Sequence, residues 1–293
     1  MTHIPVLLDE VVTLLDPKPG DIILDATVNR GGHTKELAKH IGKQGIAIGI
    51  DLNTHALAET KKELEDINAR IYLEQENFRN LDRVLAKHNI EKVNCALFDL
   101  GYSSQELEER RGFSFMKDEP LLMTYNPHTT ENDLTAKVIV NTLSEEALSN
   151  IFFAYGEERK SRKIARAIVE YRETKDIETT GELVKVIEGV IKKTGKIHPA
   201  TKVFQGLRIA VNDEYGALKE ALEKIWSHTK EGGRIGIITF HSGEDRIVKQ
   251  FFKEKTKEGG VLITKKPIAP QRKEVISNPR ARSAKLRVIE YHV

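Results

Sequence analysis

Residues 22–51 constrain the fold most, because they have the pattern of a strand, a glycine-containing turn, a helix and a second strand. The apolar run IILD ends at Asp25, the turn DATVNRGGHT follows, and a second apolar run, IAIGID, ends at Asp51. In such βαβ units, small residues let the backbone approach a ligand, and an acidic residue about 20 positions further on binds ribose hydroxyls. We therefore predict a cofactor that contains a nucleoside.

The same turn indicates which cofactor this is. The dinucleotide pattern GxGxxG is absent, since only Gly31 and Gly32 are adjacent. The carboxylate of Asp25 would repel a pyrophosphate and attract a cationic amino-acid group. S-adenosylmethionine has such a group, so we expect it as the cofactor. A glycine pair can also serve only to make a tight turn, and this alternative stays open on these residues alone.

The later part of the chain predicts a sheet interrupted by an insert. Further apolar runs predict strands at 71–74, 95–99, 234–240, 261–264 and 286–291. Helical patterns between the early runs indicate an α/β fold with a doubly wound parallel sheet. About 135 residues separate the fourth predicted strand from the fifth, far more than a connection between a strand and a helix needs.

We therefore predict two domains. Residues 1–104 and 207–293 would form a discontinuous sheet domain, and residues 105–206 an inserted, mainly helical domain. Apolar residues at helical spacing predict a helix over 213–230. The stretch 267–283 has three prolines and no periodicity, so we expect an extended loop there.

Positive charge is concentrated in two segments, although the net charge is only +2. Residues 264–293 have eight Lys or Arg against two acids, and residues 192–208 have five bases and no acid. Such clusters are typical of a phosphate-binding face, although they can also be plain solvated surface.

The composition excludes several other classes. No apolar run reaches the length of a transmembrane helix, and the N-terminus lacks the bases of a secretory signal, so we expect a cytoplasmic protein without a membrane partner. No Cys/His cluster has zinc spacing, so we expect no metal.

Eight ordered blocks make the chain resemble a known family over nearly its full length. They are HIPVLLDEVV, DATVNRGGHT, LFDLGYSS, RRGFSFMKDEPL, YGEERKSRKIARAIV, HPATKVFQGLRIAVNDE, GGRIGIITFHSGEDRIVKQFF and NPRARSAKLRVIE. The family is the bacterial 16S ribosomal RNA cytosine-N4 methyltransferases (RsmH, formerly MraW). The resemblance implies a class I S-adenosylmethionine-dependent methyltransferase fold, with the insert as its substrate-recognition domain. It also implies a target cytosine in the decoding centre, with small-subunit ribosomal RNA or the 30S particle as partner.

The blocks and the residue patterns together give the candidate site residues. The resemblance assigns the cofactor to Gly31, Gly32, His33, Asp51, Phe78, Asp99 and Glu106, and the turn itself adds Asp25. We propose Asp99 as the acceptor for a hydrogen of the target amine, with Tyr102, Ser103 and His241 as further catalytic candidates. The candidate RNA-binding residues are Arg159, Arg162, Lys163, Arg166, Lys202, Arg280, Arg282 and Lys285.

The sequence departs from the family pattern near these positions. Asn29 replaces a Gly, Glu106 a Gln and Gly243 a Leu, and four residues differ within 122–126. Two readings therefore stay open beside the enzyme: a diverged paralogue that acts on another RNA site, and a non-catalytic RNA-binding or ribosome-assembly factor. A small-molecule methyltransferase would explain the sheet, but it would leave the basic tail without a role.

Overall fold

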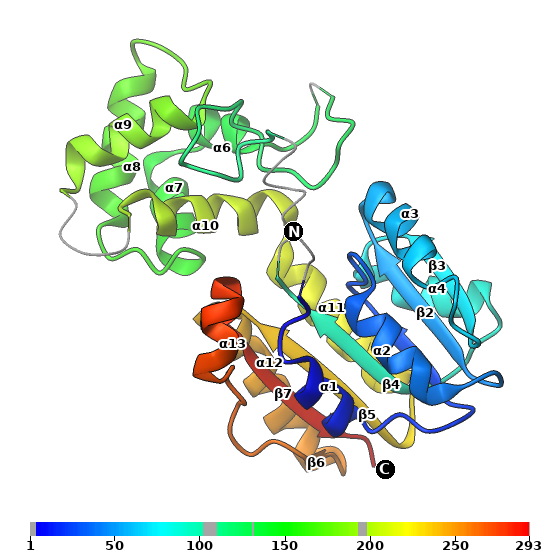
Figure 1. Cartoon of the computed structure of the whole chain (residues 1–293). Helices are drawn as coiled ribbons and strands as arrows, with labels where there is room; N and C mark the ends of the chain where they lie inside the picture. Colours follow the sequence, from blue (N-terminus) through cyan, green and yellow to red (C-terminus); the bar gives the residue numbers. More distant parts are fainter. Residues whose placement is uncertain (1–3, 102–109, 131, 193–197, 293) are drawn as a thin grey trace. The chain divides into compact units, whose positions relative to one another are not determined.

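The chain divides into two compact units, which are described separately (Figure 1). The computed structural model describes residues 4–101, 110–130, 132–192 and 198–292. Unit 1 consists of Met1–Gly101 and Tyr215–Val293, and unit 2 of Tyr102–Glu214. Unit 2 extends past the predicted insert to Glu214, because helix α10 (Ala200–Asn212) continues without a break across position 206 and packs into the core of unit 2.

Unit 1 is built on a seven-stranded sheet in the order β3-β2-β1-β4-β5-β7-β6. The strands are β1 (Ile22–Asp25), β2 (Ile46–Asp51), β3 (Arg70–Gln75), β4 (Val93–Asp99), β5 (Thr229–Thr239), β6 (Val261–Leu262) and β7 (Lys285–Glu290). The first five pair in parallel, whereas β7 is antiparallel to both β5 and β6. All seven predicted strands are confirmed, and the sheet is mixed at the β7–β6 edge.

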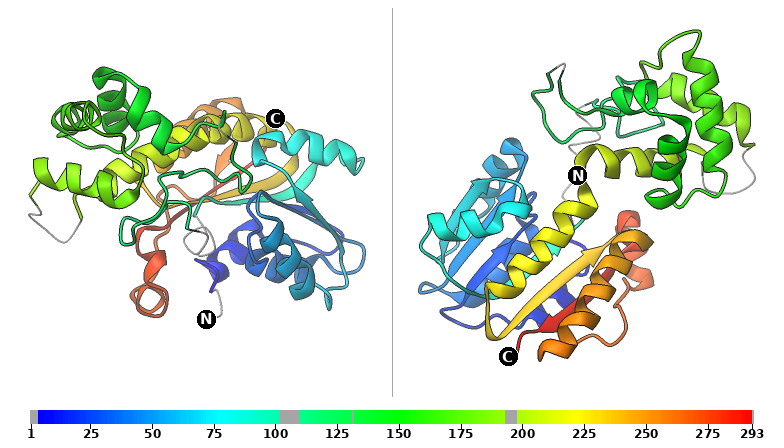
Figure 2. Two further views of the ribbon diagram at one scale, coloured as in Figure 1. Left: turned by 90° about the horizontal axis from the view of Figure 1, so that it is seen from above. Right: turned by 180° about the vertical axis from the view of Figure 1, so that it is seen from behind.

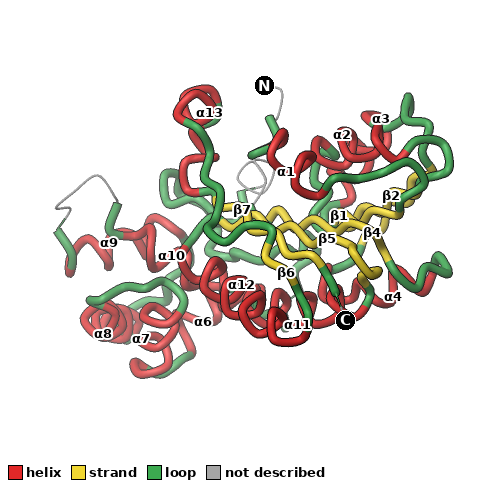
Figure 3. The backbone as a smooth tube through the Cα atoms, turned by 90° about the horizontal axis from the view of Figure 1, so that it is seen from below, coloured by secondary structure: helices red, strands yellow, loops and turns green. Residues whose placement is uncertain are grey.

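Helices cover both faces of this sheet (Figure 3). On one face, α4 (Leu81–Lys87), α11 (Glu214–Ser227) and α12 (Ser242–Lys255) pack on Leu24 and Ile48. On the other, α1 (Leu8–Leu15) and α2 (Gly32–Ile41) pack on Ile23 and Ala47. Neighbouring residues of one strand thus enter opposite cores, as side chains that alternate across a strand must. Figure 2 shows α11, in yellow, lying along the sheet beside α12, in orange.

Two local predictions in unit 1 are wrong. The helix predicted over 213–230 ends at Ser227, and β5 begins at Thr229, so the pair Gly232-Gly233 lies inside the strand. Gly232 has φ +70° there, and the pairing with β4 shifts register between Val93 and Cys95. The predicted loop over 267–283 contains α13 (Arg272–Ser277) and the 3-10 helix η3 (Pro279–Ser283), because the prolines flank the helical segment and do not interrupt it.

The remaining elements of unit 1 are α3 (Thr54–Glu63) and two short 3-10 helices, η1 (Phe78–Asn80) and η2 (Thr256–Glu258). Among the described residues, no helix is both long and apolar enough to cross a bilayer.

Unit 2 is a helical body with its own core. Its described helices are α6 (Ala136–Thr142), α7 (Glu145–Ala154), α8 (Ser161–Arg172), α9 (Thr180–Val190) and α10. Phe152, Ile164, Ile168, Leu183 and Leu207 are fully buried and pack together. Each of α6, α7 and α9 begins after a Ser or Thr whose side chain accepts a hydrogen bond from a backbone amide of the first turn, which stabilises the helix start.

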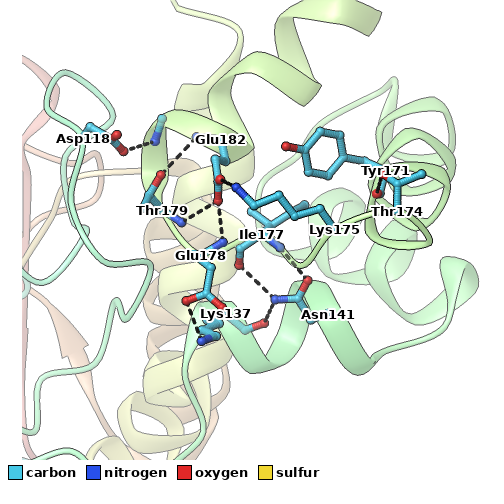
Figure 4. A network of polar contacts seen from close by, with 11 residues as sticks. Asp118, Lys137, Asn141, Tyr171, Thr174, Lys175, Ile177, Glu178, Thr179 and Glu182 are labelled. Atoms are coloured by element: carbon cyan, nitrogen blue, oxygen red, sulfur yellow. Dashed lines mark hydrogen bonds and ion pairs between the residues drawn. The ribbon is translucent and has the colours of Figure 1, made fainter.

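A polar network fixes the loop before α9 (Figure 4). The Glu182 carboxylate accepts hydrogen bonds from the Glu178 and Thr179 amides and pairs with Lys175. The Asn141 side chain accepts from the Ile177 amide and donates to the Ile177 carbonyl, which ties the loop to α6. The amides of Ile177, Glu178 and Thr179 and the carbonyl of Ile177 lie before the helix, and each thereby has a hydrogen-bond partner that fixes the loop.

Candidate cofactor site and nucleic-acid interface

Three acidic residues mark the carboxyl ends of adjacent strands in unit 1. Asp25, Asp51 and Asp99 are the last residues of β1, β2 and β4, and β1 lies between the other two strands. After β1, the next two strands, β2 and β3, lie on one side of it, whereas β4 and β5 lie on its other side. The carboxyl end of β1 is therefore the point at which the strand order reverses. Ligands of open α/β sheets bind at such a point.

The turn between β1 and α2 is shaped by its glycines. Asn29 and Gly31 both have positive φ, 46° and 73°, and the Gly31 amide donates to the Val28 carbonyl at 2.7 Å. A Cβ atom on Gly31 would lie 2.6 Å from Cγ2 of Thr60, and one on Gly32 would lie 2.4 Å from Cγ of Pro5. Close packing therefore requires glycine at both positions, and the positive φ of Gly31 requires it there for backbone conformation as well.

Asp25 holds this turn together. Its carboxylate, 1% exposed, accepts hydrogen bonds from Oγ1 of Thr34 at 2.6 Å and from the Thr27 amide at 3.2 Å. Burial raises the pKa of Asp25, although these hydrogen bonds and nearby His33 oppose the shift. The structure thus gives Asp25 a role in the turn, and its direct contact with a cofactor stays a prediction.

Asp51 presents a carboxylate at the same edge. Its Oδ2 accepts a hydrogen bond from the Asn29 amide and its Oδ1 one from the Asn53 amide, each at 2.8 Å. Burial raises the pKa of Asp51, and the two amides act in the opposite direction. A carboxylate has about four acceptor positions, so the Asp51 oxygens can still accept from two hydroxyl groups.

Asp99 and His33 lie together at the end of β4. His33 Nδ1 is 3.7 Å from Asp99 Oδ2, and His33 Nε2 donates to the Val6 carbonyl at 2.9 Å. The Asp99 amide donates a hydrogen bond to Oγ1 of Thr27 at 2.6 Å. Burial raises the pKa of Asp99 to about 6, with His33 lowering it and Asp25 raising it further.

Two buried oxygens at this edge have no hydrogen-bond partner among the described residues: Oδ1 of Asp99 and Oδ1 of Asn29. Leaving a buried acceptor unpaired costs about 1–3 kcal/mol, more for a charged group, so such atoms point to a missing donor. A cation with N–H donors, such as the ammonium of an amino-acid moiety, would satisfy both charge and hydrogen bonding. The residues present therefore fit the methionine end of S-adenosylmethionine, and Asp51 fits its ribose.

Phe78 lies beyond β3, in the 3-10 helix η1. It is half-buried and meets Phe98 edge-on, with ring centroids 6.0 Å apart. It thus packs on the core while one part of the ring stays accessible, which is compatible with an adenine contact. Tyr102, Ser103 and Glu106, the remaining predicted residues of this group, lie outside the described residues.

His241 has a structural role that its position after β5 does not reveal. It is the N-cap of α12, where the Glu244 amide donates to its Nδ1 at 3.4 Å. In return, Oε2 of Glu244 accepts from the Phe240 amide at 2.8 Å and the His241 amide at 3.2 Å. This is a capping box, in which a helix start is stabilised from both sides. The predicted catalytic role of His241 stays a prediction.

The predicted RNA-binding residues differ in their surroundings. In unit 2, Arg159, Arg162, Lys163 and Arg166 are all exposed at the start of α8. Lys202 is half-buried, and its Nζ donates to the Glu157 carbonyl at 2.9 Å. In unit 1, Arg280 and Arg282 are exposed in η3, whereas Nζ of Lys285 donates to Asp245 at 3.2 Å. The structure therefore leaves the α8 residues and the two arginines of η3 on the surface, and it gives Lys202 and Lys285 internal partners.

Sequence reasoning missed the residues that support the site. Pro5, Val6, Thr27 and Thr34 contact the turn or its acids, yet none of them is an acid, a base or a glycine. The available signals were two blocks of the family pattern: HIPVLLDEVV contains Pro5 and Val6, and DATVNRGGHT contains Thr27 and Thr34.

Comparisons with known proteins show the family of the chain. The sequence profile of the MraW methylase family matches residues 1–292. A protein of Dictyoglomus thermophilum named ribosomal RNA small subunit methyltransferase H is 46% identical over 290 residues, which cover 98% of this chain and 96% of the relative. A protein of Acetivibrio thermocellus with the same name is 45% identical over 310 residues, which cover 98% of each chain.

Among solved structures, a Streptococcus mutans protein in complex with SAH aligns with a TM-score of 0.48 at 14% identity, over 98% of this chain and 99% of that one. The predicted family and the class I methyltransferase fold are confirmed by the profile, the two relatives and the sheet. The chain belongs to the MraW methylase family, and its cofactor is S-adenosylmethionine.

Proposed function

We propose that the protein methylates N4 of a cytosine in 16S ribosomal RNA of the small subunit, near the decoding centre. The observation that supports this most directly is the Asp99 carboxylate at the end of β4, which is 17% exposed and whose buried Oδ1 has no hydrogen-bond partner among the described residues. Relatives that are 45–46% identical are named as methyltransferases of small-subunit ribosomal RNA.

The chemistry explains why a carboxylate is needed. The bound cofactor supplies a methyl group on a sulfonium, which reacts by in-line displacement without a metal. The exocyclic amine of cytosine is a poor nucleophile, because its lone pair is delocalised into the ring. Asp99 accepts a hydrogen bond from this amine, which returns electron density to the nitrogen as the methyl group approaches, and it takes the proton that the nitrogen loses once the N–C bond has formed. Exclusion of water at this edge strengthens the interaction.

The cofactor residues have separate tasks in this proposal. Asp51 accepts hydrogen bonds from the ribose hydroxyls, and Phe78 covers the adenine. The turn at Gly31 and Gly32 lets the backbone approach the methionine moiety, and His33 stays beside Asp99. Glu106, Tyr102 and Ser103 keep the roles that the family resemblance gives them: cofactor contact, base stacking and polar contact with the base.

RNA binding is electrostatic in the proposal. Unit 2 is the substrate-recognition domain and contributes the exposed bases of α8. Unit 1 contributes Arg280 and Arg282, while Lys285 and Lys202 contribute less because each already has an internal acceptor. The partner is small-subunit ribosomal RNA or the 30S particle, and the place of action is the cytoplasm. Single-stranded RNA is the usual target of base-specific recognition, and a base must be extruded before it can react.

The diverged-paralogue reading depends on Asn29, Glu106, Gly243 and the segment 122–126, and this last segment is engaged inside unit 2. The Tyr125 amide donates to Oδ1 of Asn212, and the Tyr125 hydroxyl donates to Glu214 at 2.9 Å. The Asn212 side chain thus accepts from the Tyr125 amide through Oδ1 and donates to the Met123 carbonyl through Nδ2. Tyr125, one of the departures from the family pattern, thus has a structural use in unit 2.

The test is mass spectrometry of nucleosides from 16S ribosomal RNA of cells with and without the gene. N4-methylated cytidine should disappear on deletion and return with the wild-type gene, but not with the Asp99→Asn variant. Loss of a different methylated nucleoside would support the paralogue, and an unchanged nucleoside profile would support the non-catalytic factor.

A further inference from the structure

The residues just after the N-terminus connect two distant parts of unit 1. Residues 4–7, here named the N-terminal strap, make four contacts, two on each side of the strap. On the first side, Cγ of Pro5 lies where a Cβ atom of Gly32 would be, 2.4 Å away, and the Val6 carbonyl accepts from Nε2 of His33 at 2.9 Å. Gly32 and His33 are the first two residues of α2, so the strap rests on the start of the cofactor helix.

On its other side the strap is bound by α13 and the residue after it. Oε1 of Glu274 accepts from the Leu7 amide at 2.8 Å, and Nδ2 of Asn278 donates to the Ile4 carbonyl at 3.0 Å. These residues are about 270 positions away in the chain. The strap therefore lies between the C-terminal segment and the first turn of α2, bonded to both.

The conformation of the strap needs this support. Leu7 is fully buried with φ +55°, in the left-handed region that a non-glycine residue adopts only with steric strain. It is also the residue before α1, and its side chain does not cap that helix. The hydrogen bond from its amide to the Glu274 carboxylate is charge-assisted, and such bonds are stronger than those between neutral groups. Glu274 thus offsets the backbone strain at the point where the strap turns.

We propose that Glu274 and Asn278 are positioning residues for the cofactor. By holding the strap they keep Pro5 on Gly32 and the Val6 carbonyl on His33, so that the turn and the His33 ring stay beside Asp99. Neither residue touches the candidate site, and both act through the strap. The inference rests on the proposed placement of the cofactor at this turn.

The test compares variants of one short helix. Binding of S-adenosylhomocysteine, which cannot react, is measured by calorimetry for wild type, Glu274→Ala, Glu274→Gln, Asn278→Ala and Ile276→Ala. Ile276 is 73% exposed on the same helix and is the matched control. We expect Glu274→Ala to weaken affinity at least fivefold and Asn278→Ala to weaken it in the same direction. Glu274→Gln, which retains an acceptor oxygen, should stay within about twofold of wild type, as should Ile276→Ala.

Hydrogen exchange of the cofactor-free protein supplies a readout that does not involve the ligand. In Glu274→Ala the amides of the strap and of the first turn of α2 should exchange faster, while those of β2 stay protected. Unchanged affinity together with faster exchange in the strap would overturn the proposal, and so would unchanged exchange. An Asp51→Ala variant, measured in parallel, tests the cofactor site itself. If it binds S-adenosylhomocysteine with wild-type affinity, the proposed cofactor site is wrong. Failure to methylate RNA would count against the proposed function, but it would not change the binding results for Glu274 and Asn278.

Discussion

His33 and Asp99 approach each other across the cofactor turn, with Nδ1 of the ring 3.7 Å from Oδ2 of the carboxylate. One residue comes from the first turn of α2 and the other from the end of β4. Because the Val6 carbonyl can only accept, the hydrogen of a neutral His33 ring is on Nε2, and Nδ1 presents a lone pair toward Asp99. A neutral His33 therefore gives the carboxylate no hydrogen bond.

The first prediction concerns stability and pH. The pKa of Asp99 is raised from 3.8 to about 6 by burial, so the folded state favours the protonated form. An acid whose pKa is higher in the folded state than in the unfolded state stabilises the fold fully at pH values below its pKa in the unfolded state. This contribution is lost as the pH rises through its pKa in the folded state. Two pKa units correspond to about 3 kcal/mol. Relative to wild type, Asp99→Asn should therefore gain stability between about pH 4 and pH 6, and the difference should be constant above about pH 7.

Urea unfolding of cofactor-free wild type and Asp99→Asn at a series of pH values measures this difference. A gap of constant size from pH 4 to pH 8 would show that Asp99 has an ordinary pKa in the folded protein.

The second prediction concerns the ribose. Asp51→Ala removes an acceptor for two hydroxyl groups, each worth about 1.5–3 kcal/mol before desolvation, and should weaken S-adenosylmethionine binding at least tenfold. The same change also frees the Asn29 and Asn53 amides, so the melting temperature must be measured beside the affinity. Asp51→Asn, which keeps one acceptor oxygen, is the matched variant. Calorimetry that gives wild-type affinity for Asp51→Ala would remove this residue from the site.

The third prediction separates two tasks of Asp99. Asp99→Asn preserves the shape of the side chain but supplies a weaker acceptor, so turnover should fall much more than cofactor affinity. Turnover is measured on small-subunit RNA at saturating cofactor, and affinity by calorimetry with S-adenosylhomocysteine. Equal losses in the two quantities would mean that Asp99 serves only the cofactor.

The fourth prediction concerns RNA. Log affinity should fall linearly with log salt, and each phosphate contact that is lost should reduce the slope by about 0.7–0.9. Charge reversal at Arg162, Lys163 and Arg166 of α8 should lower the slope, and so should charge reversal at Arg280 and Arg282.

The control for this series is a charge reversal at Lys61 and Lys62, which are exposed on α3 and belong to neither basic segment. If the wild-type slope persists in the α8 variant and in the η3 variant, the basic segments are ordinary solvated surface. The small-molecule methyltransferase then becomes the better reading.

The fifth prediction concerns packing at the start of α12. A Cβ atom on Gly243 would lie 1.7 Å from the Tyr215 hydroxyl oxygen, so the tyrosine occupies the space of any side chain at 243. Gly243→Ala should cost about 1–3 kcal/mol of stability through overpacking. Gly243→Leu, which restores the residue of the family pattern, should be tolerated only together with Tyr215→Ala. Additive effects of the two changes in a double-mutant cycle would show that the residues do not compete for one space.

The sheet could be predicted because each strand contains a short apolar run that is bounded by polar residues or glycine. β1 and β2 were predicted to the residue, since Asp25 and Asp51 end the apolar runs at the carboxyl ends of the two strands. The start of β5 could not be predicted, because Thr229 to Gly233 has no apolar pattern and joins the sheet only through its pairing with β4 and β7. Helix α13 was missed because its flanking prolines resemble those of a loop.

The site could be predicted only as far as its charged residues and glycines. Asp25, Asp51 and Asp99 are visible as acids at strand ends, but their partners come from contacts that the sequence does not show. The bond between Glu274 and Leu7 joins residues 267 positions apart, and Thr27 meets Asp99 across two strands. Such contacts follow from the fold, so they become visible only when the sheet has been assembled.

The placement of β4 beside β5 has a consequence for synthesis of the chain. Asp99 faces Ile238, and the whole of unit 2 is made between them. At about 5–20 residues per second, β4 waits roughly 7–28 s for this neighbour. During that time β1 can cover one side of β4, while the other side is an open edge of the kind that promotes aggregation. Unit 2 has a core of its own and can fold in the interval, so the nascent chain closes its central sheet last.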